Sequence, residues 1–273
     1  MFTVDILYSL IRSMTKSEKR YFRILSAMQK GEKSYIVLFD ALEKYPAFDE
    51  STKAELQKLY PNNSIEPARK HLYHVLMKSL RQFDSEKDIE TKLMNLLHDS
   101  RILYSKGLLN QSLEQLDRVK QLALEREKFL YYIIAARQEL RYLVQTQFSG
   151  IIEYQLMEKQ KQIRDLLEQE IKVSQYSMLY EILLLRYWKN GIVRSQQEIT
   201  QLNDLLLEEY QLLNTHGEKS FEWQQIHLQF QSTYFQMIGN PEGNPNVFYE
   251  LDALFQKNGR LWSDTPLSYF YVL

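Results

Sequence analysis

Long stretches with the composition of helices end at four regularly placed glycines, Gly107, Gly150, Gly191 and Gly239. Successive glycines in this set are 43, 41 and 48 residues apart. Glycine adopts the left-handed conformation that ends one helix and lets the next one fold back. A period in the forties with two helices in each unit is typical of a helical solenoid. The predicted helix pairs cover residues 86–106 and 108–127, 129–148 and 151–171, 174–190 and 193–214, and 217–238 and 245–258.

Residue usage favours helices over strands in these stretches. The 273 residues include 8 Gly and 6 Pro, fewer than the roughly 7% and 5% of average usage. Sheet proteins and α/β enzymes use more of both residues in their turns. Hydrophobic residues make up 44% of the chain and charged residues 25%, a composition that excludes wholesale disorder. The predicted fold class is therefore all-α.

Two kinds of helix alternate in the predicted pairs. Residues 129–134 and 182–185 are apolar on more than one side, so their helices need several covering neighbours. The second helices carry a single apolar stripe, as in residues 113–123. In a stack of hairpins, inner helices are covered on several sides, whereas outer helices are covered on one side. Residues 226–230 alternate like a strand, but no neighbouring segment offers a partner strand, so they are also predicted as helix.

The first 84 residues are predicted to form a separate helical module. Thr15 and Glu18 stand in a capping-box pattern that starts a helix. Residues 1–84 hold 14 Lys and Arg against 10 Asp and Glu, whereas residues 85–273 hold 20 against 25. This difference in charge favours a basic module over 1–84 and repeats over 85–273. The predicted helices of the module cover residues 15–30, 34–45, 49–60 and 64–83.

The turn at the first glycine resembles that of the tetratricopeptide repeat. Tyr104, Gly107 and Leu109 stand at the offsets of that family's turn, followed by the small residue Ser112. Ser100 matches the small residue of the family's first helix. The other repeats keep only the turn glycine and are longer than the family's usual unit, so the resemblance implies a tetratricopeptide-like α-solenoid. The whole chain also resembles uncharacterised bacterial proteins in which an N-terminal helical module precedes such repeats, which implies no activity.

The sequence lacks the motifs of the common catalytic and metal centres. It has no cysteine, which excludes disulfides, zinc–thiolate sites, iron–sulfur clusters and thiol catalysis. No phosphate loop, dinucleotide fingerprint, nucleophile elbow or zinc-protease motif occurs. His71 and His74 have a spacing that can share a metal, but such a bare pair also occurs on ordinary amphipathic helices. We predict a non-enzymatic protein without catalytic residues, metal site or cofactor.

The unburied face of the inner helices is the predicted binding surface, because solenoids bind partners on the concave side that these helices line. Arginines and neutral amides occur there, and amides suit the donors and acceptors of an extended peptide backbone. Any solvated helix face also needs polar residues, so each residue by itself fits plain solvation. The predicted function is a protein- or peptide-binding scaffold. The predicted partner-binding residues are Arg137, Gln138, Arg141, Gln145, Glu181, Gln224, His227 and Gln231.

A nucleic-acid-binding regulator is the alternative. Residues 49–60 and 64–83 have the outline of a helix-turn-helix, although the turn lacks the usual glycine and the second helix is rich in core-type residues. Basic residues also share one face of the helix that starts at Thr15. That face equally fits a solvated surface. The candidate nucleic-acid-binding residues are Lys16, Lys19, Arg20 and Arg23.

The two ends of the chain bear on its location and its assembly. Residues 1–13 lack the pattern of a signal peptide, and the longest apolar run, 129–136, is far too short for a membrane span. A cytoplasmic protein without membrane insertion is predicted. Thr265 and Pro266 start a further apolar helix through Leu273 that has no partner helix. We expect the last repeat to be incomplete and this end to contact missing repeats or another chain, unless it folds back on the preceding pair.

Overall fold

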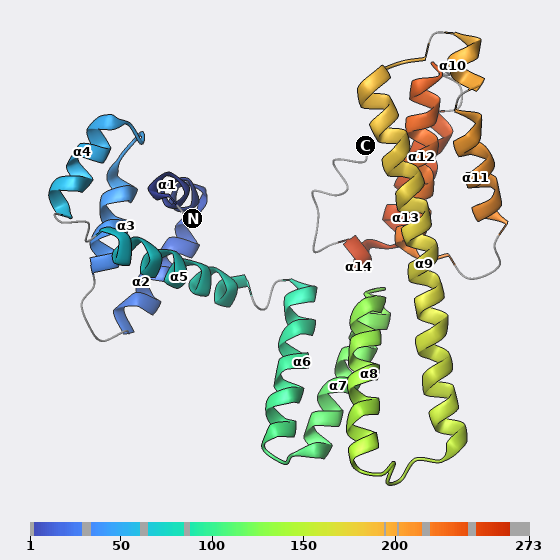
Figure 1. The fold of residues 1–273 in the computed structure, drawn as a ribbon, viewed down its shortest axis with the longest axis horizontal. Coiled ribbons are helices and arrows are strands. Elements are labelled where there is room, and N and C mark those ends of the chain that lie inside the picture. The colour runs from blue at the N-terminus through green and yellow to red at the C-terminus, as the bar shows by residue number, and fades with distance from the viewer. Residues whose placement is uncertain are drawn as a thin grey trace. The chain divides into compact units, whose positions relative to one another are not determined.

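The computed structural model describes residues 3–28, 34–60, 65–84, 88–193, 195–200, 202–214, 219–239 and 244–262. The chain divides into two compact units, Met1–Thr91 (unit 1) and Lys92–Leu273 (unit 2). The described part of the chain contains helices and no strand, which confirms the all-α prediction (Figure 1). The unit boundary falls in the first turn of α6 (Ile89–Ser105), just after the predicted boundary between residues 84 and 85.

The described residues of unit 1 form five helices, of which the first was not predicted and the other four follow the predicted ones closely. Its first predicted helix start is present in detail, because Thr15 Oγ1 accepts from the Glu18 backbone and Glu18 Oε2 accepts from the Thr15 backbone. The two bonds satisfy amides that a helix start leaves without partners. The helices are α1 (Val4–Ser13), α2 (Lys16–Met28), α3 (Ser34–Lys44), α4 (Glu50–Leu59) and α5 (Ile65–Asp84).

The core of unit 1 forms where α2 and α3 pack against α5, and α1 packs against α3. The rings of Phe22 and Phe39 lie 4.5 Å apart, and both side chains are fully buried. These contacts fix which face of α2 remains exposed to solvent. The other fully buried apolar side chains of this core are Leu7, Ile11, Leu38, Leu42, Leu72 and Leu76.

Unit 2 contains the predicted repeat region. Its longest helix, α9, runs without interruption from Glu153 to Asn190. The predicted break between residues 171 and 174 is therefore wrong. No glycine or proline occurs between residues 151 and 190, so nothing in the sequence stops the helix. The helices are α6, α7 (Leu109–Glu125), α8 (Phe129–Gln145), α9, α10 (Gln196–Thr200), α11 (Asn203–Leu213), α12 (Phe221–Met237), α13 (Asn244–Lys257) and α14 (Gly259–Trp262).

The four turn glycines lie outside the helices, as predicted. Their φ values are +78°, +79°, +71° and +64°, a conformation that side chains with a Cβ rarely adopt. The turn between α7 and α8 has no glycine, and Glu127 takes the left-handed conformation there with φ +50°. Its carboxylate accepts from the backbone N–H of Phe221 at 2.6 Å and so connects this turn to the start of α12. Residues 226–230 lie in α12, so the helix predicted there is confirmed.

Helix α9 belongs to two groups of helices. Its first half packs against α8, where Lys159 and Gln162 contact the α8 residues Glu139 and Tyr132. Its second half packs against α11 and α12, which bury Leu183 completely. Figure 1 shows α8 beside the first half of α9, with α6 and α7 farther from α9, and α11 and α12 beside the second half. The helix predicted from Thr265 to Leu273 lies outside the described residues.

Candidate functional site

The surface of α8 carries most of the exposed residues predicted to bind a partner. Arg137, Arg141 and Gln145 are exposed. Exposed apolar residues share their side of the helix, because Leu130 is 56% exposed, Ile134 45% and Val144 58%. Residues three and four apart on a helix are neighbours on its surface. We call Leu130, Ile134, Arg137, Arg141 and Val144, which follow one another at intervals of four, three, four and three residues, the α8 stripe.

Gln138 does not belong to this surface, although the sequence placed it there. Its side chain is 6% exposed, its Oε1 accepts from Arg101 Nε of α6 at 3.1 Å, and its Nε2 donates to the Tyr142 hydroxyl at 2.8 Å. Tyr142 stacks on Tyr104 of α6 with ring centroids 3.7 Å apart. Gln138 is buried because α6 covers this side of α8, where Gln138 accepts a hydrogen bond from Arg101.

The opposite side of α8 is fixed by a buried ion network. Glu139 lies between Lys120 of α7, with Nζ 2.5 Å from Oε2, and Lys159 of α9, with Nζ 2.8 Å from Oε1. Burial by itself would lower the pKa of Lys120, but hydrogen bonds to Asp117 and Glu139 raise it above its ordinary value. The network connects three helices and leaves the α8 stripe facing away from it. Sequence patterns do not predict this network, because its three members come from three helices.

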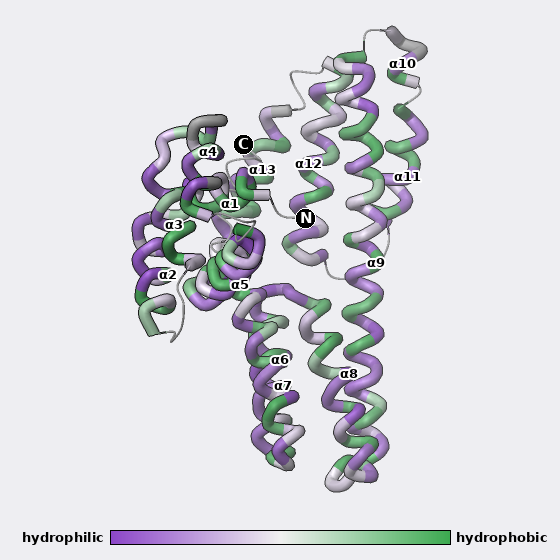
Figure 2. The backbone as a smooth tube through the Cα atoms, turned by 60° about the vertical axis from the view of Figure 1, so that its left-hand side comes forward, coloured by the Kyte–Doolittle hydropathy of each residue, from purple (hydrophilic) through white to green (hydrophobic). Residues whose placement is uncertain are grey.

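On α9, Glu181 is exposed as predicted. It lies along a row of exposed apolar residues, since Met178 is 52% exposed, Leu185 51% and Trp188 76%. Figure 2 shows hydrophilic and hydrophobic residues alternating along α8 and α9. The exposed faces of both helices thus combine apolar and charged side chains.

The predicted residues on α12 are partly covered. Gln224, His227 and Gln231 are each of intermediate exposure. His227 Nδ1 lies 2.9 Å from Glu209 Oε1 and 3.2 Å from the Tyr176 hydroxyl. This histidine therefore contacts α11 and α9, which is a packing role rather than that of a free binding residue.

Glu209 of α11 is a buried carboxylate. It is 5% exposed. Burial, together with the charge of Glu209, raises the pKa of Tyr176 well above its ordinary value. A sequence signal for this position existed, because Leu202, Leu205, Glu209 and Leu212 follow the spacing of one buried helix face.

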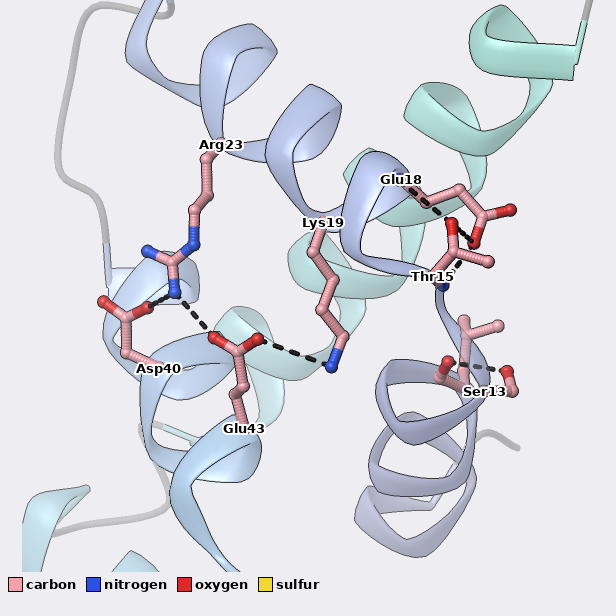
Figure 3. Close-up of polar contacts among 8 residues, drawn as sticks. Ser13, Thr15, Glu18, Lys19, Arg23, Asp40 and Glu43 are labelled. Atoms are coloured by element: carbon pink, nitrogen blue, oxygen red, sulfur yellow. Dashed lines mark hydrogen bonds and ion pairs between the residues drawn. The ribbon is translucent and has the colours of Figure 1, made fainter.

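The basic residues on α2 line a shallow hollow together with Ile24, Ala27 and Glu43. Figure 3 shows two of them directed at carboxylates of α3. Arg23 lies 2.8 Å from Asp40 and 2.7 Å from Glu43, and Lys19 lies 3.4 Å from Glu43. The hydrogen bond to Glu43 and the charge of Asp40 raise the pKa of Arg23 despite its partial burial.

These ion pairs reduce the positive charge available to a ligand. Of the four predicted nucleic-acid-binding residues, Lys19 and Arg23 are compensated by α3, whereas Lys16 and Arg20 are exposed and form no ion pair with the described residues. In the predicted helix-turn-helix, Arg69 of α5 is 8% exposed and lies 2.7 Å from Glu66. On α2, Lys16 and Arg20 are therefore the two exposed cations without an ion-pair partner among the described residues.

The described residues contain no group of three or more His, Asp or Glu placed to hold a metal ion. Within the same residues, no helix combines the length and hydrophobicity that crossing a membrane requires.

The described residues define an all-helical protein whose α8 and α9 carry exposed faces of mixed apolar and charged character. A comparison with family models, curated proteins and solved structures found no match to the chain.

Proposed function

We propose that this chain is a non-enzymatic, cytoplasmic scaffold that binds a protein or peptide segment on the exposed face of α8. The α8 stripe is the observation that carries the proposal. Three of its five residues are apolar side chains with 45–58% of their surface exposed, and two are arginines, a residue type enriched at protein interfaces. Exposed apolar residues that gather on one face of a helix, with polar residues beside them, are typical of interaction sites.

The setting of the stripe supports binding without a large entropic cost. Glu139 ties α8 to α7 and α9, and Gln138 ties it to α6. A surface that is already fixed before binding loses little conformational freedom when a partner docks. We propose that Gln145 extends this surface at the C-terminal end of α8 and that Glu181 belongs to a second contact area on α9.

We also propose that the hairpin of α6 and α7 is a tetratricopeptide-like unit. Ser100 and Ser112 are both fully buried, and the Ser112 hydroxyl donates to the Ser100 carbonyl at 2.8 Å. Small residues at this position let the two helices approach closely, as the resemblance of the Gly107 turn implies. The α8 stripe then corresponds to the inner helix of the following hairpin.

Site-specific photo-crosslinking tests the binding face. A photoreactive amino acid at Ile134 should capture a host protein, whereas one at Leu124, 38% exposed on α7, should not. Arg137→Ala/Arg141→Ala should reduce capture from position 134 while changing stability by no more than about 0.5 kcal/mol, because exposed substitutions rarely cost more. Arg118→Ala/Arg164→Ala removes the same charge from exposed positions on α7 and α9 and serves as the control. Equal capture from positions 134 and 124, or capture that the α8 pair does not affect, contradicts the proposal.

The alternative proposal is nucleic-acid binding by α2. The observation that favours it is the exposure of Lys16 and Arg20 beside an open hollow. Binding of a labelled DNA duplex should then be measurable at low salt and weaken steeply as salt rises, since phosphate contacts release counterions. Lys16→Gln/Arg20→Gln should abolish this binding, and Lys70→Gln/Lys78→Gln on α5 is the matched control. Absence of binding at low salt rules out this alternative.

A further inference from the structure

The spacing of the α8 stripe fits a helical partner. Its five residues follow the four-three-four-three pattern that brings side chains into one row along a helix. Such a row packs into the groove of a second helix whose apolar residues have the same spacing. From Leu130 to Val144 the row is about 21 Å long at 1.5 Å per residue, so a partner helix of about four turns covers it.

The charges of the stripe select an acidic partner. Arg137 and Arg141 occupy its middle, and Gln138, next to Arg137 in the sequence, accepts a hydrogen bond from Arg101 of α6. The one carboxylate of α8, Glu139, is 9% exposed and bound to two lysines away from the stripe. These three arginines form no ion pair with described residues. Carboxylates of a partner would therefore meet cations that the described residues leave uncompensated.

The apolar ends of the stripe favour a helix over a nucleic acid or an extended peptide. Leu130 and Ile134 at one end, and Val144 at the other, need apolar cover, which a phosphate backbone does not supply. An extended peptide would need a ladder of amide groups, and Gln138, which was predicted to contribute to one, is buried and already paired. Gln145 is then the one predicted amide of α8 that is exposed.

We propose that the α8 stripe binds an acidic amphipathic helix of a partner protein. Apolar residues of that helix cover Leu130, Ile134 and Val144, and two of its carboxylates face Arg137 and Arg141. This inference rests on the proposed function, because it names the partner of the same face.

Synthetic helical peptides test the chemistry of the partner. The probe is a peptide of about 15 residues with leucines at the two ends of one helix face and two glutamates in the middle of that face. One control peptide replaces the glutamates with lysines, and a second places a proline in the middle, which prevents a continuous helix. Binding to the full chain is measured by fluorescence anisotropy and by the gain of peptide helicity in circular dichroism.

We expect the glutamate peptide to bind at least about tenfold more tightly than either control, to gain helicity on binding, and to weaken as salt is added. Arg137→Glu/Arg141→Glu should reverse the preference, so that the lysine peptide binds more tightly. Arg137→Gln/Arg141→Gln, which removes charge without adding any, should make the two peptides equal. A thermal melt of each variant verifies that it is folded.

Other outcomes separate this inference from the proposed function. Equal binding of the glutamate and lysine peptides, tight binding of the proline peptide, or no binding of any peptide overturns the acidic helix as the partner. If capture from position 134 persists in those cases, the α8 face still binds a protein of different chemistry. If capture from position 134 fails as well, the proposed function fails with it.

Discussion

Removing the carboxylate of Glu139 tests whether the buried ion network holds α8 in place. The side chains of Lys120 and Glu139 are 12% and 11% exposed, and losing one partner of a buried pair costs about 3–5 kcal/mol because the other charge is stranded. Lys120 keeps Asp117 at 2.7 Å, although the Asp117 side chain is 59% exposed. We therefore expect Glu139→Ala to lower the free energy of unfolding of unit 2 by about 2–4 kcal/mol.

Tryptophan fluorescence is the appropriate assay. The three tryptophans of the chain, Trp188, Trp223 and Trp262, all lie in unit 2, so their emission during urea unfolding reports on that unit. The melting temperature should fall by about 5–15 °C, since 1 kcal/mol corresponds to about 2–4 °C in a unit of this size. Glu114→Ala, at an exposed position of α7, should change the free energy of unfolding by no more than about 0.5 kcal/mol.

A charge-free variant separates the ion network from simple packing. The free energy of unfolding of Lys120→Met/Glu139→Leu, which removes both buried charges, should be within about 1 kcal/mol of that of the natural chain, because apolar replacements of a buried pair are often neutral.

The stabilisation by the ion network also depends on pH. The pKa of Lys120 is raised above its ordinary 10.5, so its stabilisation is present at neutral pH and disappears as the pH rises through the folded-state pKa. The difference between the natural chain and Glu139→Ala should therefore narrow above about pH 10.5. A decrease of less than about 0.5 kcal/mol in the free energy of unfolding of Glu139→Ala would refute this reasoning. So would an equal decrease in Glu139→Ala and in Lys120→Met/Glu139→Leu.

Further predictions concern the turns, the close helix contact and the acid limit. Gly191→Ala should lower the free energy of unfolding by about 1–3 kcal/mol, because an alanine is strained at φ +71°. Gly259→Ala should change the urea midpoint little, because Gly259 has no positive φ and its added Cβ meets open space. Ser112→Val should cost about 2–4 kcal/mol in the same assay, because it removes two hydrogen bonds to Ser100 and adds volume at a buried contact. Hydrogen bonds from Arg186 lower the pKa of Asp204 below its ordinary 3.8, so this pair stabilises the fold above that pH and less as the pH falls through the folded-state pKa. Asp204→Asn should flatten the stability profile below about pH 4, and an unchanged slope would show that the pair does not contribute.

Local features of the sequence correctly predicted most helix ends. Thr15 and Glu18 start α2 through hydrogen bonds within one helical turn. Gly107 lies in the turn that follows α6, because glycine adopts a positive φ without strain. Both effects depend on residues close in the chain, and such patterns can be read without knowledge of the fold. The break predicted near residue 171 is absent. It was inferred from a repeat period, and no glycine, proline or other local signal supports it.

The tertiary structure decided which polar residues are free and which are buried. Arg137 and Gln138 are adjacent in the sequence and look equally suited to a binding surface, yet Gln138 is covered by α6 through Arg101, 37 residues away. In the sequence, Glu139 and Glu209 look like ordinary surface carboxylates. In the fold, Glu139 contacts lysines of two other helices and Glu209 contacts a histidine of α12. Helical periodicity indicates the face on which a side chain lies. Only the packing of the neighbouring helices determines whether that face is exposed to solvent, because burial arises from residues distant in the chain.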